Sequence, residues 1–264
     1  MANIHPSSIV DPAARIADDV VIGPFCTIGP NVEIGAGTTL QSHIVVTGHT
    51  VIGERNKIYA FAAIGIDPQD KKYRNEPTRL VIGNDNVIRE HCTLSTGTIQ
   101  DHSLTQIGDG NLLMANVHIA HDCVVGDGTI IANNVGLAGH VHVGNDAIIG
   151  GQSGVHQFVR IGRGAMLSGG SMVRQDIIPY GMYQGYPAAP FGINVEGMKR
   201  HAYTHTAIRA ARQAYRLIFR DGNTIAEAVT AINALADSID DEQAKKVCAL
   251  MRDFIESSPR GIAR

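Results

Sequence analysis

The chain has 264 residues, and its 22 Lys and Arg residues nearly balance 25 Asp and Glu residues, giving a formal net charge of −3. This balance excludes a general electrostatic attraction to nucleic acid or to an anionic membrane surface. Hydrophobic residues make up 44% of the chain, but aromatic residues only 5%, and Trp is absent. The core must therefore be built mainly from small and branched aliphatic side chains.

The first residues carry no basic stretch followed by an apolar stretch, so the sequence gives no sign of a signal peptide. No apolar run approaches the length of a membrane span. The cysteines lie far apart and form no Cys-x-x-Cys pair: Cys26, Cys92, Cys123 and Cys248. Such spacing is typical of reduced, mostly buried thiols. We therefore expect a cytoplasmic protein without a membrane span.

The strongest signal is a six-residue repeat that begins near the N-terminus. An aliphatic residue occupies every sixth position eleven times in a row from Ile4 to Ile64, and twelve times in a row from Ile107 to Val173. Gly often follows the aliphatic residue, which favours a tight turn. The period excludes a heptad coiled coil, and one apolar residue in six is too sparse for an up-and-down barrel.

A repeat of this kind predicts a coil in which every repeat forms a short strand and a corner. Three repeats make one triangular turn of 18 residues. Residues one turn apart then stack about 4.8 Å above one another. The inward aliphatic side chains fill the interior, and each strand pairs with the coils above and below it. We therefore predict a parallel β-helix over residues 4–178.

Two segments break the six-residue register. The first, residues 66–79, has Asp70 and Glu76 where aliphatic residues would fall, and the second lies near residues 98–105. Both are predicted to be loops that leave the coil, and loops on rigid scaffolds often carry function. The first loop is richer in charge than the rest of the chain, which favours a binding role over a tolerated surface insertion.

The pattern changes after Pro179, where further prolines at positions 187 and 190 mark a linker. Beyond it, apolar residues recur at three- and four-residue spacing, which predicts helices near residues 206–220, 224–237 and 241–257. The sequence thus predicts a mainly β chain in two parts. Residues 1–190 are expected to form the parallel β-helix, and residues 191–264 a small C-terminal α-helical domain.

Histidine is over-represented, with 12 residues, and five of them cluster in the second series of repeats: His118, His121, His140, His142 and His156. Stacking by 18 residues places polar and aromatic groups on two neighbouring lines of the coil: His121, Gly139 and Gln157 on one, and Asp122, His140 and Phe158 on the other. These residues are expected to converge on a patch about 10 Å tall, which is two coil spacings.

The residues alone leave three interpretations of this cluster open. A single His on such a coil is most often structural and bonds a backbone carbonyl. Several together, beside an Asp, favour either a general base, for which imidazole suits neutral pH, or a metal site. Cys123, close to His121, is expected to serve packing rather than to act as a nucleophile.

Several motifs, taken in order, resemble one family. They are Gln69-Asp70-Lys71-Lys72-Tyr73, Glu76-Pro77-Thr78, His118-Ile119-Ala120-His121-Asp122, Leu137-Ala138-Gly139-His140, Val155-His156-Gln157-Phe158, Pro190-Phe191-Gly192 and Lys199-Arg200. The family is that of the acyl-ACP:UDP-N-acetylglucosamine O-acyltransferases, hexapeptide-repeat enzymes that catalyse the first step of lipid A biosynthesis. The resemblance covers nearly the whole chain, including both loops and the helical tail.

The resemblance implies a left-handed coil, a homotrimer with active sites between subunits, and an acyl transfer that needs no cofactor and no metal. An acyl group, typically 3-hydroxyacyl, would pass from acyl carrier protein to the 3-hydroxyl of UDP-N-acetylglucosamine by direct attack on the thioester. In that reaction His121 would be the general base, and Asp122 would orient its imidazole. The backbone N–H of Gly139 would stabilise the oxyanion.

The resemblance also implies binding residues. The substrate-binding positions near the sugar are Gln69, Asp70, Lys72, His118 and Gln157, and those near the nucleotide are Asn194, Glu196 and Arg200. His201 stands where a second Arg often follows, and His140 and His156 match functional positions whose separate roles the sequence does not distinguish. Gly169 matches the position that sets acyl chain length, although Met172 would narrow the same groove, and a glycine kept for a tight corner is the alternative.

Four arginines step by three, four and four residues along the first long tail helix: Arg209, Arg212, Arg216 and Arg220. This spacing predicts that they share one helix face. Acyl carrier proteins are strongly acidic, and a row of cations would steer such a partner toward the enzyme. The alternative is an ordinary solvated helix face.

Three other functions share parts of this pattern. A γ-type carbonic anhydrase would use His ligands to zinc on such a coil. An N-acyltransferase that acts on a later intermediate of the same pathway would need an additional N-terminal domain, whereas the repeats here begin at Ile4. A non-catalytic assembly scaffold is disfavoured by the charged first loop and by the histidine cluster.

Overall fold

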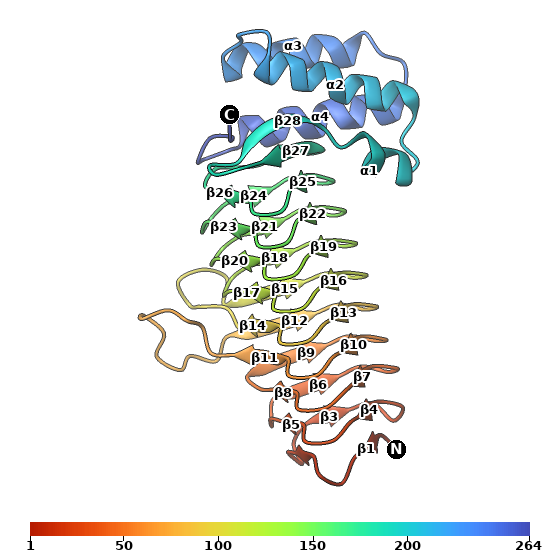
Figure 1. Cartoon of the computed structure of the whole chain (residues 1–264), viewed down its shortest axis with the longest axis vertical. Helices are drawn as coiled ribbons and strands as arrows, with labels where there is room; N and C mark the ends of the chain where they lie inside the picture. Colours follow the sequence, from red (N-terminus) through yellow and green to blue (C-terminus); the bar gives the residue numbers. More distant parts are fainter.

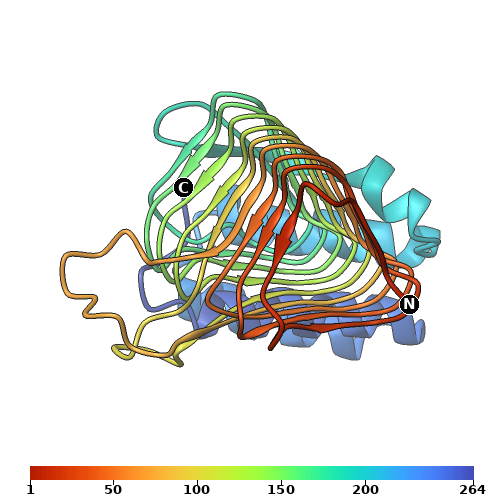
Figure 2. The same ribbon diagram turned by 90° about the horizontal axis from the view of Figure 1, so that it is seen from below.

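The computed structural model describes all residues from 1 to 264. Figure 1 shows one long coil of strands that leads from the N-terminus to a layer of helices, and Figure 2 shows that the coil is triangular in cross-section. Each side of the triangle is a sheet of short, mostly parallel strands. The predicted fold class, a parallel β-helix followed by helices, is therefore confirmed.

Three sheets form the coil. The first contains β1 (Asn3–Ile4), β4 (Val21–Ile22), β7 (Thr39–Leu40), β10 (Lys57–Ile58), β13 (Val87–Ile88), β16 (Leu112–Leu113), β19 (Ile130–Ile131), β22 (Ile148–Ile149), β25 (Met166–Leu167), β27 (Gly181–Gln184) and β28 (Ala189–Ile193). The second contains β2 (Ile9–Val10), β5 (Thr27–Ile28), β8 (Val45–Val46), β11 (Ala63–Ile66), β14 (Thr93–Ser95), β17 (His118–Ile119), β20 (Gly136–Leu137), β23 (Gly154–Val155) and β26 (Met172–Val173). The third contains β3 (Arg15–Ile16), β6 (Val32–Ile34), β9 (His49–Ile52), β12 (Arg79–Ile82), β15 (Leu104–Ile107), β18 (Val124–Val125), β21 (His142–Val143) and β24 (Arg160–Ile161).

The register of the strands follows the sequence repeat. In uninterrupted coils a residue pairs with the residue 18 positions later, as Ile119 of β17 does with Leu137 of β20. In the third sheet, however, Ile52 pairs with Ile82 and Ile82 pairs with Ile107, so these two steps are longer. Each longer step means that one turn of the coil carries additional residues outside the strands.

The additional residues form two loops. Loop 1, residues 67–78, connects β11 to β12, and loop 2, residues 96–103, connects β14 to β15. Both project from the same part of the prism, beside the coils that carry the histidine cluster (Figures 1 and 2). Their position makes them neighbours of the candidate site rather than distant surface insertions.

The interior of the coil is packed with aliphatic side chains. The second residue of most strands points inward and is almost fully buried, as Ile64, Leu94, Ile119 and Leu137 are. Burial of such a side chain contributes about 1.5–3 kcal/mol, so the stacked aliphatic residues hold the coil rigid. The preceding residue of each strand points outward, and His118 therefore lies on the outer face of β17.

One corner of the triangle carries the candidate site. Asp122, His140 and Phe158 occupy this corner in three successive coils, with φ angles of 58°, 64° and 65°. Few non-glycine residues adopt such angles. Here the coils hold one another in this conformation, because His140 N–H donates to the His121 carbonyl and Phe158 N–H to the Gly139 carbonyl, at 3.0 and 3.1 Å.

The helical region begins directly after β28. It contains α1 (Val195–Arg200), α2 (His205–Phe219), α3 (Ile225–Asp237) and α4 (Glu242–Glu256). Each helix starts after a residue whose side chain accepts a hydrogen bond from a backbone N–H of the first turn: Asn194, Thr204, Thr224 and Asp241. The helices cover one end of the coil (Figure 1). No helix combines the length and the apolar character needed to cross a membrane.

Candidate active site

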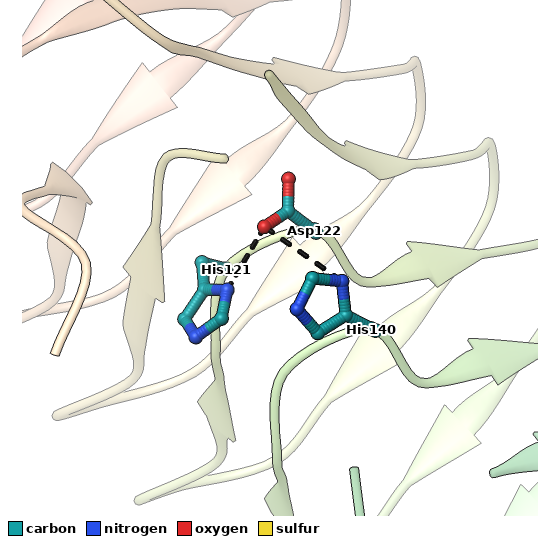
Figure 3. A group of neighbouring side chains, drawn as sticks. All are labelled: His121, Asp122 and His140. Carbon is teal, nitrogen blue, oxygen red and sulfur yellow. Dashed lines mark hydrogen bonds and ion pairs between the residues drawn. The ribbon is translucent and has the colours of Figure 1, made fainter. Parts of the chain in front are cut away.

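Two imidazoles and one carboxylate lie together at this corner (Figure 3). Nδ1 of His121 lies 2.9 Å from Oδ2 of Asp122, and Nδ1 of His140, one coil further on, lies 3.9 Å from the same oxygen. The two imidazole rings meet edge to face, with centroids 5.0 Å apart. The stacking of coils therefore brings the predicted residues into one cluster.

The Asp122 carboxylate is buried, with only 2% of the residue exposed. Burial alone would raise the pKa of Asp122, but the hydrogen bonds from His121 and Thr98 outweigh it and lower this pKa below its ordinary value. Asp122 is thus an anion at neutral pH and accepts a hydrogen bond from Nδ1–H of His121. That contact leaves Nε2 of His121 as the nitrogen with a free lone pair.

Gly139 lies against the His121 ring. A Cβ atom at position 139 would stand 2.5 Å from Cε1 and 2.8 Å from Nε2 of His121, so any side chain here would displace the imidazole. The backbone N–H of Gly139 donates to no acceptor in the protein. A free N–H beside a basic nitrogen is the arrangement that stabilises a developing oxyanion next to a general base.

Loop 2 supplies two residues that the sequence analysis missed. Thr98 donates to both oxygens of Asp122, from its backbone N–H at 2.9 Å and from its hydroxyl at 2.6 Å. Oδ2 of Asp101 lies 2.7 Å from Nδ1 of His140, whose ring stacks on Phe158 with a centroid distance of 4.2 Å. Both contacts cross from the loop to the coil, where the repeat gives no register to reveal them.

The other predicted site histidines border the cluster. Nδ1 of His118 lies 2.7 Å from the Thr93 hydroxyl, and burial, followed by the charge of nearby His121, lowers the pKa of His118. His118 is therefore neutral at neutral pH. Nδ1 of His156 lies 3.1 Å from the Gln157 carbonyl oxygen.

A polar cavity of about 910 Å³ opens between loop 1 and the cluster. Its lining includes the predicted substrate residues Gln69, Asp70, Lys72, His140 and Gln157, together with His121. Within loop 1, Asp70 Oδ1 accepts the Lys72 backbone N–H at 2.9 Å, which forms a local turn. The cavity thus presents charged and amide groups around one face of the His121 imidazole, as a polyhydroxylated ligand requires.

A second cavity of about 610 Å³ begins at His121 and Gly139 and follows the outer face of the second sheet. Two outward glycines, Gly136 and Gly154, pair with each other and leave this face without side chains. At the far end the groove meets Met172, whose sulfur lies so close to Gly154 that a Cβ there would approach it to 2.8 Å. The groove therefore combines an apolar floor with a definite end.

Gly169 does not line this groove. It precedes Gly170 at a different corner of the triangle, where it is exposed and where Gly170 has a φ angle of +71°. The structure of the single chain thus brings Met172 to the groove end and leaves Gly169 outside it.

The three predicted nucleotide-binding residues lie in or next to α1, apart from both cavities. The Asn194 side chain caps α1 through Gly197 N–H and also donates to the Gly164 carbonyl. Glu196 forms an ion pair with Lys199 at 2.8 Å. Arg200, at the last turn of α1, is exposed. Within one chain, these residues and the His121 cluster do not meet.

The four predicted arginines are all exposed. Arg209, Arg212 and Arg216 lie on α2, and Arg220 is its C-terminal capping residue. Arg216 is paired with Asp221, with Nε and Oδ1 3.0 Å apart, so part of its charge is neutralised locally. The guanidinium of Arg220 lies over the Tyr215 ring, 6.0 Å from its centroid.

Cys123 follows Asp122 in the chain, and its thiol is fully buried. Burial raises the pKa of Cys123 to about 12. The thiol is thus protonated at neutral pH and shielded from any ligand, so it cannot act as a nucleophile.

Comparisons with known proteins agree with this geometry. The family described as "Udp N-acetylglucosamine O-acyltransferase; Domain 2" matches residues 176–263, and the bacterial transferase hexapeptide repeat matches residues 1–36, 13–48 and 104–139. The crystal structure of LpxA from Acinetobacter baumannii is 51% identical, with 99% of each chain covered and a TM-score of 0.94. The UDP-N-acetylglucosamine O-acyltransferase of Moraxella catarrhalis is 50% identical, with 99% of each chain covered and a TM-score of 0.94.

A more distant relative has the same fold. The UDP-N-acetylglucosamine acyltransferase of Francisella novicida is 39% identical over 99% of this chain and 94% of its own, with a TM-score of 0.94. These matches also bear out the left-handed sense of the coil that the motifs implied. Because identity of this level extends over the full length, the chain belongs to the UDP-N-acetylglucosamine O-acyltransferase family.

Proposed function

We propose that this protein transfers an acyl group, typically 3-hydroxyacyl, from acyl carrier protein to the 3-hydroxyl of UDP-N-acetylglucosamine, the first step of lipid A biosynthesis. One observation carries the proposal. His121 lies between the Asp122 carboxylate, which fixes its ring, and the unpaired N–H of Gly139, at the junction of the polar cavity and the apolar groove. A base, an oxyanion donor and two binding regions of opposite polarity meet there.

The reaction follows from this arrangement. Nε2 of His121 removes the proton of the sugar hydroxyl as its oxygen attacks the thioester carbonyl. Asp122 stabilises the imidazolium that forms, because Nδ1–H points at its carboxylate. The Gly139 N–H receives the oxyanion. The C–S bond then breaks, and the imidazolium returns its proton to the departing thiolate, leaving the ester and a free thiol on the carrier.

The two cavities divide the substrates by polarity. The polar cavity, with Gln69, Asp70, Lys72 and Gln157, accepts the glucosaminyl part, and His118 borders the groove near the same point. The apolar groove over Gly136 and Gly154 accepts the acyl chain. His140 and His156 face these spaces from successive coils and contribute to substrate binding.

We further propose a homotrimer in which a neighbouring subunit supplies Asn194, Glu196 and Arg200 to the nucleotide. The support is that these family positions lie away from the cavities of their own chain. A planar guanidinium suits a diphosphate, which favours Arg200 for that contact. The solution mass, measured by light scattering, should be three times that of the 28.2 kDa chain. A stable monomer with full activity would contradict this arrangement.

The Arg209, Arg212, Arg216 and Arg220 face is proposed to attract the acidic carrier protein, and the reaction is proposed to occur in the cytoplasm, where that carrier is expected. Exposure of all four cations supports the attraction. Isolated exposed charges contribute little to affinity but raise the rate of encounter.

The metal-dependent alternative rests on the same cluster. One ligand atom from each of His121, Asp122 and His140 lies within 4.8 Å of the others. However, Nδ1 of His121 already faces Asp122, and Nδ1 of His140 faces Asp101 at 2.7 Å. Both imidazoles thus direct these nitrogens at carboxylates, which suits proton transfer and orientation better than a shared zinc ion.

A product assay tests the proposed function. Purified protein, UDP-N-acetylglucosamine and 3-hydroxyacyl carrier protein should give a nucleotide sugar heavier by one acyl group, attached as an ester that mild base cleaves. Activity should persist in EDTA, and the protein should contain no stoichiometric zinc. Failure of a folded trimer to form this ester, or a bound zinc whose removal abolishes the reaction, would reject the proposal.

A further inference from the structure

We propose that Thr98 and Asp101 of loop 2 are positioning residues that hold His121, through Asp122, and His140 in their working orientations. The inference rests on the proposed function, which gives these imidazoles a chemical task. It assigns a role to the second interruption of the repeat, which would otherwise be a surface insertion.

Thr98 fixes the plane of the Asp122 carboxylate. The terminal torsion of an Asp side chain is soft, so a carboxylate held at one point rotates freely over a wide range. Here the Thr98 backbone N–H binds Oδ1 and the Thr98 hydroxyl binds Oδ2, at 2.9 and 2.6 Å. Thr98 is only 1% exposed, so water does not compete for these bonds. The two contacts aim Oδ2 at Nδ1 of His121.

The backbone of Asp122 is held from another side. Its N–H donates to the Thr105 hydroxyl at 2.8 Å, on β15 directly after loop 2. Loop 2 and the strand that follows it thus contact the same aspartate. Because the Asp122 position is fixed by the loop as well as by its own coil, the His121 ring has a defined partner before substrate binds.

Asp101 does for His140 what Asp122 does for His121. Its Oδ2 lies 2.7 Å from Nδ1 of His140, and the face of that ring rests on Phe158, with an angle of 6° between the planes. The stack fixes the tilt of the ring, and the carboxylate fixes which nitrogen carries the proton. Nε2 of His140 is then left for a ligand in the polar cavity. The site therefore contains two His–Asp pairs, one internal to the coil and one completed by loop 2.

Loop 2 is held for this role by hydrogen bonds to the ends of β11 and β12, the two strands that flank loop 1. Thr96 N–H donates to the Ile66 carbonyl at 3.0 Å, and Gly97 N–H to the Arg79 carbonyl at 3.1 Å, so it binds residues that flank loop 1. At Gly97 the chain passes so close to Leu104 that a Cβ would stand 2.1 Å from its backbone nitrogen.

The test compares two buried threonines of the same loop. Thr98→Val removes the hydroxyl that binds Asp122, whereas Thr96→Val removes a hydroxyl that only meets the Thr78 hydroxyl, at 3.1 Å. Thr98→Val should lower kcat by about tenfold to a hundredfold, the effect of losing a hydrogen bond to a charged group, with little change in KM for UDP-N-acetylglucosamine. Thr98→Ser should restore kcat, and Thr96→Val should keep it.

The imidazoles can also be observed directly. Nitrogen NMR of labelled histidine should show a single tautomer of His140 with the proton on Nδ1 in the wild type, and a mixture in Asp101→Ala. Full kcat in Thr98→Val, equal loss in Thr96→Val, or an unchanged His140 signal in Asp101→Ala would overturn the inference. The NMR result does not depend on turnover, so an inactive wild type with these signals would reject the proposed function alone.

Discussion

Two corners of the same prism carry stacked aromatic rings, but only one is equipped for chemistry. At the corner between the first and second sheets, rings from four successive coils stack with centroids 4.9 to 5.0 Å apart: Phe25, His43, Phe61 and His91. All four have positive φ angles, as do His140 and Phe158 at the other corner. The backbone adopts the same positive φ angle at both corners, and both His and Phe occur at these positions.

The difference lies in what surrounds the rings. The imidazoles of His43 and His91 make no hydrogen bond, and both residues are exposed. At the other corner, His121 and His140 each meet a carboxylate, and a bare glycine gives the His121 ring its space. At the first corner, the histidines therefore serve only the stack of rings. At the second corner, acidic partners, a free N–H and an adjoining cavity equip the histidines for catalysis.

The largest expected effect comes from removing one imidazole from each corner. His121→Ala should lower turnover by about two to four orders of magnitude, the usual contribution of a general base, without loss of the folded oligomer. His43→Ala, the matched change at the first corner, should leave turnover unchanged. Steady-state kinetics and light scattering would measure both variants, and near-normal activity of His121→Ala would remove the distinction between the corners.

A smaller loss is expected from Gly139→Ala. The added Cβ would collide with the His121 ring and crowd the N–H that receives the oxyanion, and removing one such donor costs about two to three orders of magnitude in kcat. The melting temperature should also fall, because position 139 is buried and the added Cβ must displace the His121 ring. Wild-type kcat in this variant would show that neither the ring position nor the N–H matters.

The two residues that could set acyl chain length lie in different places. Gly169 lies at the first corner, whereas Met172 closes the groove that starts at the second corner. Met172→Ala should extend the preference to longer acyl chains, measured with carrier proteins whose acyl groups differ by two carbons. Met166→Ala, the same change on the outer face of β25, should not shift it.

Gly169→Met tests the family's chain-length position in the same assay. The resemblance predicts a shift to shorter chains if Gly169 meets the acyl chain in the assembled enzyme. An unchanged profile in Gly169→Met, together with a shift in Met172→Ala, would assign the groove end to Met172. The reverse result would return that role to Gly169.

The smallest effect is expected far from both corners, on α2. Arg212→Glu with Arg216→Glu should raise KM for acyl carrier protein, and the increase should weaken as salt screens charges beyond about 8–10 Å. KM for UDP-N-acetylglucosamine should stay the same. If the double variant and the parent show equal carrier kinetics at low salt, the arginines form an ordinary solvated face.

The sequence could predict those contacts of the site that arise from the regular stacking of coils. Counting by 18 places His121 beside Gly139, and Asp122 beside His140, because every coil has the same path. Thr98 lies 24 positions before Asp122, and Asp101 lies 39 positions before His140, and neither separation is a multiple of the 18-residue turn that stacks one coil on the next. The path of a loop depends on its own contacts, and those become visible only in three dimensions.

The sequence also could not predict the direction in which individual side chains point. The position of Met172 on the outer face of β26 follows from the alternation of the strand, but its lying over Gly154 does not. The sequence likewise could not show that Asn194 uses its side chain to cap α1. Such details depend on rotamers and on neighbours from other coils, which the six-residue period does not specify.

In the proposed reaction, His121 accepts the proton of the attacking hydroxyl. The most direct measurement is the single-turnover rate of acyl transfer against pH, in the wild type and in His121→Ala. The wild-type rate should fall as the medium is acidified, because a protonated imidazole cannot accept another proton. The residual rate of the variant should lack this acidic limb. The same acidic limb in both proteins would contradict the claim and place the base elsewhere.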